Sequence, residues 1–248
     1  MYLSRARSSD QPSKKLAKAL ETKGYSVACP KLPSISNQDD ADFGKKSLTD
    51  DTKAVEDVIK DLVEQQEKVF VVLMRSYGGL VGSNAVPKEL SWADRQANGK
   101  KGGVIYLFYF AAFILGQGQS VIGTFGESPN TGIKGERYCM KDPATSMYSD
   151  LPAEESKLWA EQVVDQSYAV QTTELSHAAY KYISSTYVIS EHDQALPPQF
   201  QEMFAGATGS EIQRVATGYS PMLSKTDELV ELIDAATLKA LDTIKGLL

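Results

Sequence analysis

The sequence has 248 residues, of which 42% are hydrophobic and 23% are charged, and its formal net charge is -6. These proportions are typical of a folded globular protein and argue against a disordered chain. The longest clusters of basic residues are short pairs, so a nucleic acid partner is not expected, because phosphate backbones need a basic surface.

The chain also shows no pattern for secretion or for membrane insertion. Its longest apolar stretch, residues 104–115, is shorter than the about 20 residues of a transmembrane helix. Residues 1–10 have no apolar signal-peptide core, and the two distant cysteines, Cys29 and Cys139, are expected to be plain thiols. We therefore expect a cytoplasmic protein without a membrane partner. No pattern indicates the oligomeric state.

Helical and apolar patterns alternate over the first half of the chain. Residues 13–23 carry apolar side chains on one helical face, and a short strand is predicted at 26–29. Residues 51–65 repeat the helical pattern. Residues 69–74 and 104–110 are continuous apolar runs, typical of strands that are buried on both faces. This alternation predicts a parallel sheet flanked by helices, the α/β class.

The pattern loosens between residues 116 and 182 and then resumes. One helix is predicted there from Pro152, and the whole stretch is interpreted as an inserted helical cap. Residues 186–189 and 212–216 predict two further strands, and a helix from Ser224 ends the chain. We predict one domain: core residues 1–115, a cap at 116–182 and core residues 183–248.

The most informative stretch surrounds Ser76. A buried strand, Val71-Val72-Leu73-Met74-Arg75, turns through Ser76-Tyr77-Gly78-Gly79 into a helix. A serine in a sharp turn at the carboxyl end of a strand is exposed for nucleophilic attack. The backbone amide of Tyr77 can then donate to a developing oxyanion. The alternative interpretation is an ordinary strand-to-helix turn that contains a serine.

With this motif, the chain resembles small α/β-hydrolases, the group that includes plant methylesterases, hydroxynitrile lyases and a fungal branch. The resemblance covers nearly the whole chain. Besides the serine motif it rests on Leu16-Ala17-Lys18-Ala19-Leu20, residues 94–103, Ala111-Ala112-Phe113 and Asp150-Leu151-Pro152. It implies the α/β-hydrolase fold and esterase-like chemistry. It also implies that Asp193, within Glu191-His192-Asp193-Gln194-Ala195-Leu196-Pro197, is the acid of a catalytic triad.

The residue in the position of the catalytic base departs from this family. The resemblance implies a Gly-His-Ser-Pro turn after the last strand, but this sequence reads Gly-Tyr-Ser-Pro, with Tyr219 in place of histidine. Tyrosine has an ordinary pKa near 10, so about one part in a thousand is phenolate at pH 7. Loss of one triad member costs about 10⁴ to 10⁶ in turnover. Neither His177 nor His192 is expected to replace the base, and Arg75 is interpreted as a surface or salt-bridged residue.

The start of the chain also differs from the pattern of this family. Relatives open with a core strand whose following amide contributes a second oxyanion donor. Only residues 1–3 fit the end of such a strand here, which makes Ala6 the predicted second donor. The strands that precede it in relatives are missing, and we expect a truncated start as much as a true loss.

Three functions therefore remain open. The first is a serine hydrolase of small carboxylic esters or lactones, with Ser76, Asp193 and Tyr219 as a degraded triad. The second is a ligand binder without hydrolytic activity, and the third is a lyase or cyclase on the same fold. An apolar or aromatic small molecule is suggested by the aromatic residues of the predicted cap, Phe125, Tyr148, Trp159 and Tyr168. No motif predicts a metal, a nucleotide or another cofactor.

Overall fold

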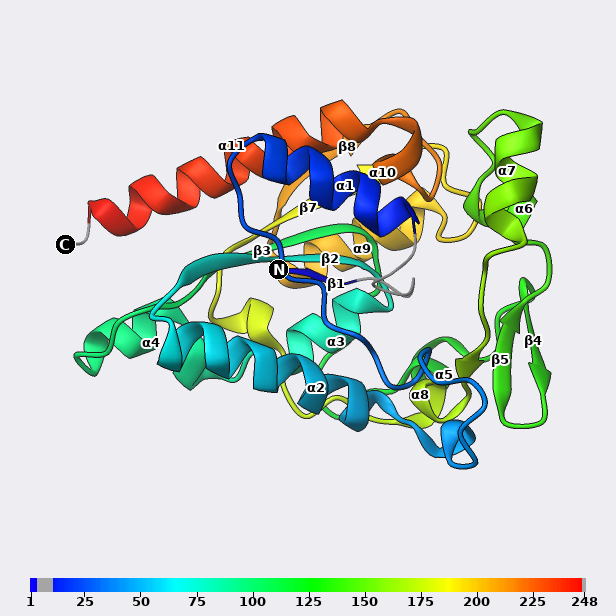
Figure 1. The fold of residues 1–248 in the computed structure, drawn as a ribbon, viewed down its shortest axis with the longest axis horizontal. Coiled ribbons are helices and arrows are strands. Elements are labelled where there is room, and N and C mark those ends of the chain that lie inside the picture. Colours follow the sequence, from blue (N-terminus) through cyan, green and yellow to red (C-terminus); the bar gives the residue numbers. More distant parts are fainter. Residues whose placement is uncertain (4–10, 247–248) are drawn as a thin grey trace.

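The computed structural model describes residues 1–3 and 11–246. A five-stranded sheet runs through the molecule with helices on both faces (Figure 1). All neighbouring strands are parallel, in the order β1-β2-β3-β7-β8. The strands are Tyr2–Leu3 (β1), Val69–Ser76 (β2), Gly103–Ala112 (β3), Ser185–Ser190 (β7) and Glu211–Val215 (β8). The predicted parallel sheet and α/β class are confirmed.

The sheet is buried because helices cover both of its faces. On one side lie α1 (Gln11–Thr22) and α11 (Thr226–Lys245), and on the other lie α2 (Leu48–Lys60), α3 (Gly78–Asn84) and α4 (Trp92–Ala97) (Figure 1). All six residues of β7 are buried, as are the last six of β2. This double coverage explains the continuous apolar runs in the sequence.

The predicted helix at 51–65 is present as α2 and its continuation. Ser47 and Asp50 form a reciprocal capping box at its start, which satisfies backbone N–H groups that have no helical partner. After Lys60 the helix continues as one wider π-helical turn, Asp61–Gln65. Shorter helical turns lie at Phe43–Lys45, Lys88–Leu90 and Pro221–Ser224 (α10), and another, Ala179–Lys181, shortly precedes β7. A longer helix, Pro198–Thr208 (α9), follows β7.

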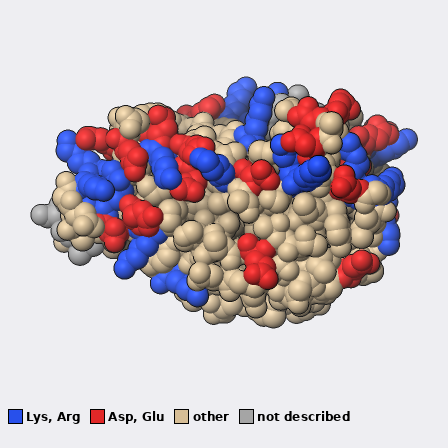
Figure 2. Space-filling model, turned by 90° about the horizontal axis from the view of Figure 1, so that it is seen from below, with Lys and Arg blue, Asp and Glu red and all other residues tan. Residues whose placement is uncertain are grey.

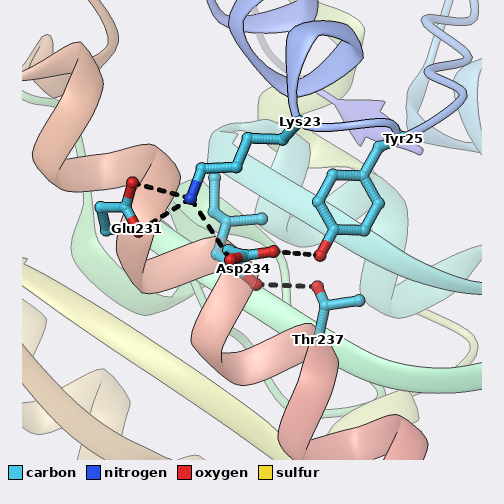
Figure 3. A network of polar contacts seen from close by, with 6 residues as sticks. Lys23, Tyr25, Glu231, Asp234 and Thr237 are labelled. Carbon is cyan, nitrogen blue, oxygen red and sulfur yellow. Dashed lines mark hydrogen bonds and ion pairs between the residues drawn. The ribbon is translucent and has the colours of Figure 1, made fainter.

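Polar contacts connect the end of α1 with α11 at the surface (Figure 3). Lys23 Nζ lies 2.7 Å from Glu231 Oε1 and 3.4 Å from Asp234 Oδ2, and Tyr25 Oη donates to Asp234. Exposed ion pairs contribute at most about 1 kcal/mol each. The apolar packing of the two helices is therefore the larger source of stability at this contact.

Two of the predicted elements need correction. Residues 26–29 form no strand, because the edge of the sheet at β1 is only two residues long and gives them too few backbone partners. The last helix begins at Thr226 and not at Ser224, which ends the separate turn α10. The predicted strand at residues 1–3 is present as β1, which pairs with β2.

The segment between β3 and β7 contains more than the one helix predicted from Pro152. Its helices are Val121–Phe125 (α5), Pro143–Met147 (α6), Ala153–Ala160 (α7) and Ala169–Thr172 (α8). It also forms an antiparallel sheet of Thr131–Lys134 (β4), Arg137–Met140 (β5) and Gln166–Ser167 (β6), which the sequence analysis missed. These strands have at most four residues and no continuous apolar run, so they lack the pattern of a buried strand.

Charges of both signs are intermixed on the face shown in Figure 2, and a wide area of that face carries few charges. Within residues 1–3 and 11–246, no helix combines the length and apolarity that a membrane span needs. Cys29 and Cys139 are both free thiols.

Candidate active site

Ser76 is the last residue of β2 and has a left-handed backbone, with φ of 56°. A residue with a Cβ atom pays about 1–2 kcal/mol for this conformation, so the surrounding packing must hold it. Helix α3 follows directly and lies against the end of β3. A Cβ on Gly79 would be 2.3 Å from the Phe113 carbonyl oxygen, so only glycine allows this approach. The sharp turn predicted at the serine is present.

Tyr219 lies in the loop between β8 and α10, far from Ser76 in sequence. Its hydroxyl group donates a hydrogen bond to Ser76 Oγ. Both residues are buried, with 2% of Ser76 and 4% of Tyr219 exposed. The residue that replaces the expected histidine therefore contacts the candidate nucleophile. In this arrangement the phenol holds the proton, and Ser76 Oγ is the acceptor.

Arg75 is not at the surface, which was one of the two predicted alternatives, because only 1% of it is exposed. Its guanidinium carbon lies 4.4 Å from the centroid of the Tyr219 ring, the geometry of a cation–π contact. Its Nη2 donates to Ser220 Oγ at 2.9 Å, and both Nε and Nη2 lie 3.3 Å from the Tyr219 carbonyl oxygen. A buried positive charge is thus fixed against Tyr219.

Asp193 follows β7 and is also buried. Its Oδ1 accepts from the backbone N–H groups of Ala195 and Leu196, each at 2.8 Å, and its Oδ2 accepts from Gln201 Nε2 at 2.9 Å. Burial raises the pKa of Asp193 to about 7, although these N–H groups and the charge of Arg75 oppose the rise. The carboxyl group is therefore divided between its neutral and charged forms near neutral pH.

Asp150 anchors the loop that carries Tyr219. Its Oδ2 accepts from Thr217 Oγ1 at 2.9 Å, the Gly218 amide at 2.7 Å and Ser224 Oγ at 2.7 Å. Burial raises the pKa of Asp150, but these hydrogen bonds outweigh it and hold the pKa below its ordinary value. Sequence reasoning missed this anchor, and the match of Asp150-Leu151-Pro152 to the family was the signal that pointed to it.

The remaining predicted residues have simpler outcomes. Tyr77 precedes α3 directly, which is where a donor to an oxyanion at Ser76 is expected. Ala6 lies outside the described residues. His177 and His192 are both exposed and do not line the cavity beside Ser76. The structure therefore brings together Ser76, Tyr77 and Tyr219, with Arg75 and Asp193 buried nearby.

A cavity of about 540 Å³ opens beside Ser76 and has Ser76, Tyr77 and Tyr219 in its wall. This volume falls within the range of small-molecule sites. Phenylalanine rings from three elements form one part of the wall, Phe113, Phe125, Phe200 and Phe204. Of the predicted aromatic cap residues, Phe125 and Tyr168 line the cavity, whereas Tyr148 and Trp159 do not.

Comparisons with known proteins show the family and the fold of the chain. The sequence model of the alpha/beta hydrolase family matches residues 8–232. The alpha/beta hydrolase nvfD of Aspergillus novofumigatus is 28% identical over 229 residues, which span 88% of each chain. Among solved structures, polyneuridine aldehyde esterase matches with a TM-score of 0.70 and 16% identity, over 95% of this chain and 98% of that chain.

Tomato methylketone synthase I, solved with 2-tridecanone, matches with a TM-score of 0.71 and 14% identity, over 97% of this chain and 96% of that chain. At these identities the solved structures show a shared fold. The family model covers most of the chain and confirms the resemblance found in the sequence. The chain belongs to the alpha/beta hydrolase family.

Proposed function

We propose that this protein is a slow serine hydrolase of small, largely apolar carboxylic esters or lactones. Ser76 is the nucleophile and Tyr219 occupies the place of the base. One observation carries the proposal: Ser76 stands in a left-handed turn with its Oγ in contact with the Tyr219 hydroxyl, in the wall of an apolar cavity. A tyrosine that no longer served the site would not need to reach Ser76.

The reaction begins from the small fraction of Tyr219 that is phenolate. This phenolate takes the Ser76 proton as Oγ attacks the ester carbonyl carbon, and the Tyr77 amide donates to the oxyanion. Tyr219 then returns the proton to the departing alcohol, which leaves an acyl group on Ser76. Water releases the acid by the same steps. The scarcity of phenolate at neutral pH explains why turnover is slow.

Arg75 favours the phenolate, and Asp193 opposes it less than a fully charged carboxylate would. The Arg75 guanidinium lies against the Tyr219 ring, so it stabilises negative charge there. Burial raises the pKa of Asp193 to about 7, which reduces the like charge that a carboxylate would place in the site. We propose that Asp193 supports the site in this way and by ordering its own loop, through its contacts with Ala195 and Leu196.

A second candidate is proton transfer to a bound ligand without an acyl intermediate, as in a lyase or cyclase. It is favoured by the direction of the Tyr219 hydrogen bond, because a phenol that keeps its proton is a better acid than base. The fold likeness to methylketone synthase I, solved with a ketone, shows that this fold accommodates such ligands in another protein.

Release of nitrophenol from short-chain esters tests the primary proposal. Native protein is expected to react slowly, and Ser76→Ala is expected to be inactive. Tyr219→Phe, which removes only the hydroxyl group, is expected to fall to the Ser76→Ala rate. Tyr219→His is expected to exceed the native rate at pH 7, because imidazole is mostly neutral there. Native activity that survives in folded Ser76→Ala would overturn the proposal.

A further inference from the structure

A buried polar cluster adjoins the cavity and takes no part in the proposed chemistry. Asp51 on α2 accepts three hydrogen bonds: from the Ser34 amide at 2.8 Å, from Ser34 Oγ at 2.5 Å and from Tyr77 Oη at 2.8 Å. Gln166 on β6 completes the cluster, since its Nε2 donates to Ser34 Oγ at 3.0 Å. Asp51, Ser34 and Gln166 are each at most 1% exposed.

The directions of these hydrogen bonds determine which end of the Gln166 amide faces Ser34. A serine hydroxyl has one hydrogen, and that of Ser34 points to the Asp51 carboxylate, which can only accept. Ser34 Oγ must therefore accept from Gln166, so the amide NH₂ faces Ser34 and Oε1 faces away from it. Among the described residues Oε1 has no hydrogen-bond partner, although it is buried.

The backbone that carries the Gln166 side chain is held in place by the neighbouring strand and by Ser167. Gln166 pairs with Tyr138 across β5 and β6. The next residue, Ser167, donates from its amide to the Ser34 carbonyl at 2.9 Å and from its Oγ to the Gly44 carbonyl at 2.8 Å. Turning the Gln166 amide so that Oε1 faces solvent would break the hydrogen bond from Nε2 to Ser34 Oγ. Gln166 lines the same cavity as Ser76 and Tyr77.

A buried acceptor without a partner costs about 1–3 kcal/mol. We propose that Gln166 Oε1 is a binding subsite for a hydrogen-bond donor of the ligand, so the cavity selects small molecules that combine an apolar body with a hydroxyl or N–H group. The apolar body packs on the phenylalanine rings of the wall. This inference rests on the proposed function only in treating the ligand of this cavity as the substrate.

Equilibrium binding tests the subsite without any turnover. The probes are phenylalkanols with two to six methylene groups between ring and hydroxyl, each paired with its methyl ether, which keeps the oxygen but loses the donor. Native protein is expected to bind at least one alcohol about tenfold more tightly than its ether. Gln166→Met, which keeps the length and removes the acceptor, is expected to bring that ratio close to one.

Gln213→Met is the control for the same exchange outside the cavity, because Gln213 lies on β8 and does not line the cavity. This variant is expected to keep the native preference. Equal binding of every pair by native protein would overturn the subsite, as would a preference that survives in Gln166→Met.

If Gln166→Met does not fold, the side-chain carbonyl carbon shift of Gln166 in native protein replaces it. That shift is expected to move with the preferred alcohol and not with its ether, and equal shifts would overturn the proposal. If the protein hydrolyses no ester but still prefers the alcohols, the proposed hydrolase activity is refuted and the Gln166 subsite is supported. If it hydrolyses esters but binds alcohols and ethers equally, the hydrolase activity is supported and the subsite is refuted.

Discussion

Replacing Arg75 with methionine tests whether the buried cation supports Tyr219. Methionine fills similar volume without charge. The desolvated cation–π contact at 4.4 Å is worth about 2 kcal/mol, which corresponds to about a 30-fold loss of ester turnover if it acts fully on the phenolate. Because the cation favours the charged form of Tyr219, its removal is also expected to move the rise of kcat/KM to higher pH.

Arg95→Met provides the control for general loss of stability. Arg95 is a second buried arginine, and it donates to the Lys101 and Val63 carbonyl oxygens at the opposite end of β2. Both variants are expected to lose about 1–3 kcal/mol in urea unfolding, from lost hydrogen bonds. Only Arg75→Met is expected to change the pH profile. An Arg75→Met enzyme with the native profile would refute the role of this cation.

Three further predictions concern the framework of the site. Gly79→Ala is expected to abolish ester turnover and lower stability by several kcal/mol, measured by urea unfolding, because its Cβ would collide with a backbone oxygen. Asp150→Asn is expected to cost at most about 1 kcal/mol at pH 7, because Asp150 is exposed to solvent, and progressively less as the pH falls below 3.8, because the native carboxylate has a lowered pKa and loses its contribution on protonation. The contribution of Asp193 to stability depends on pH in the opposite direction. Its pKa is raised from 3.8 to about 7, so native stability should fall as pH rises between these values. Asp193→Asn should remove a slope of about 1.4 kcal/mol per pH unit between pH 5 and pH 6, and an unchanged slope would contradict the assigned burial.

The contact between Ser76 and Tyr219 could be predicted because Ser76 ends one strand and Tyr219 follows another strand of the same parallel sheet, and the carboxyl ends of parallel strands share an edge. The buried position of Arg75 could not be predicted. A charged residue at the end of an apolar run is ordinarily exposed, and its partners here, Tyr219 and Ser220, come from a loop about 145 residues later in the chain. Because the partners that compensate for the burial of Arg75 are so distant in sequence, no local pattern indicates them.

The Gln166 acceptor escaped sequence reasoning for a similar reason. A two-residue strand has too little length to show alternation, and the orientation of its amide depends on Asp51 and Ser34. Likewise, one hydrogen-bond partner of the buried Asp193, Gln201, comes from α9 and not from the Asp193 loop. Patterns in sequence indicate which residue types are present, whereas these roles depend on which partners are available in three dimensions.

The role of Ser76 as a nucleophile served by Tyr219 can be measured by intact-protein mass after incubation with a nitrophenyl ester. We expect a slowly accumulating acyl adduct, mapped to Ser76, whose rate of formation rises with pH toward 10. We also expect no adduct in Ser76→Ala and faster acylation in Tyr219→His. A folded native protein that never acquires the adduct, while Tyr219→His does, would contradict this role and show that Tyr219 blocks Ser76 rather than serving it.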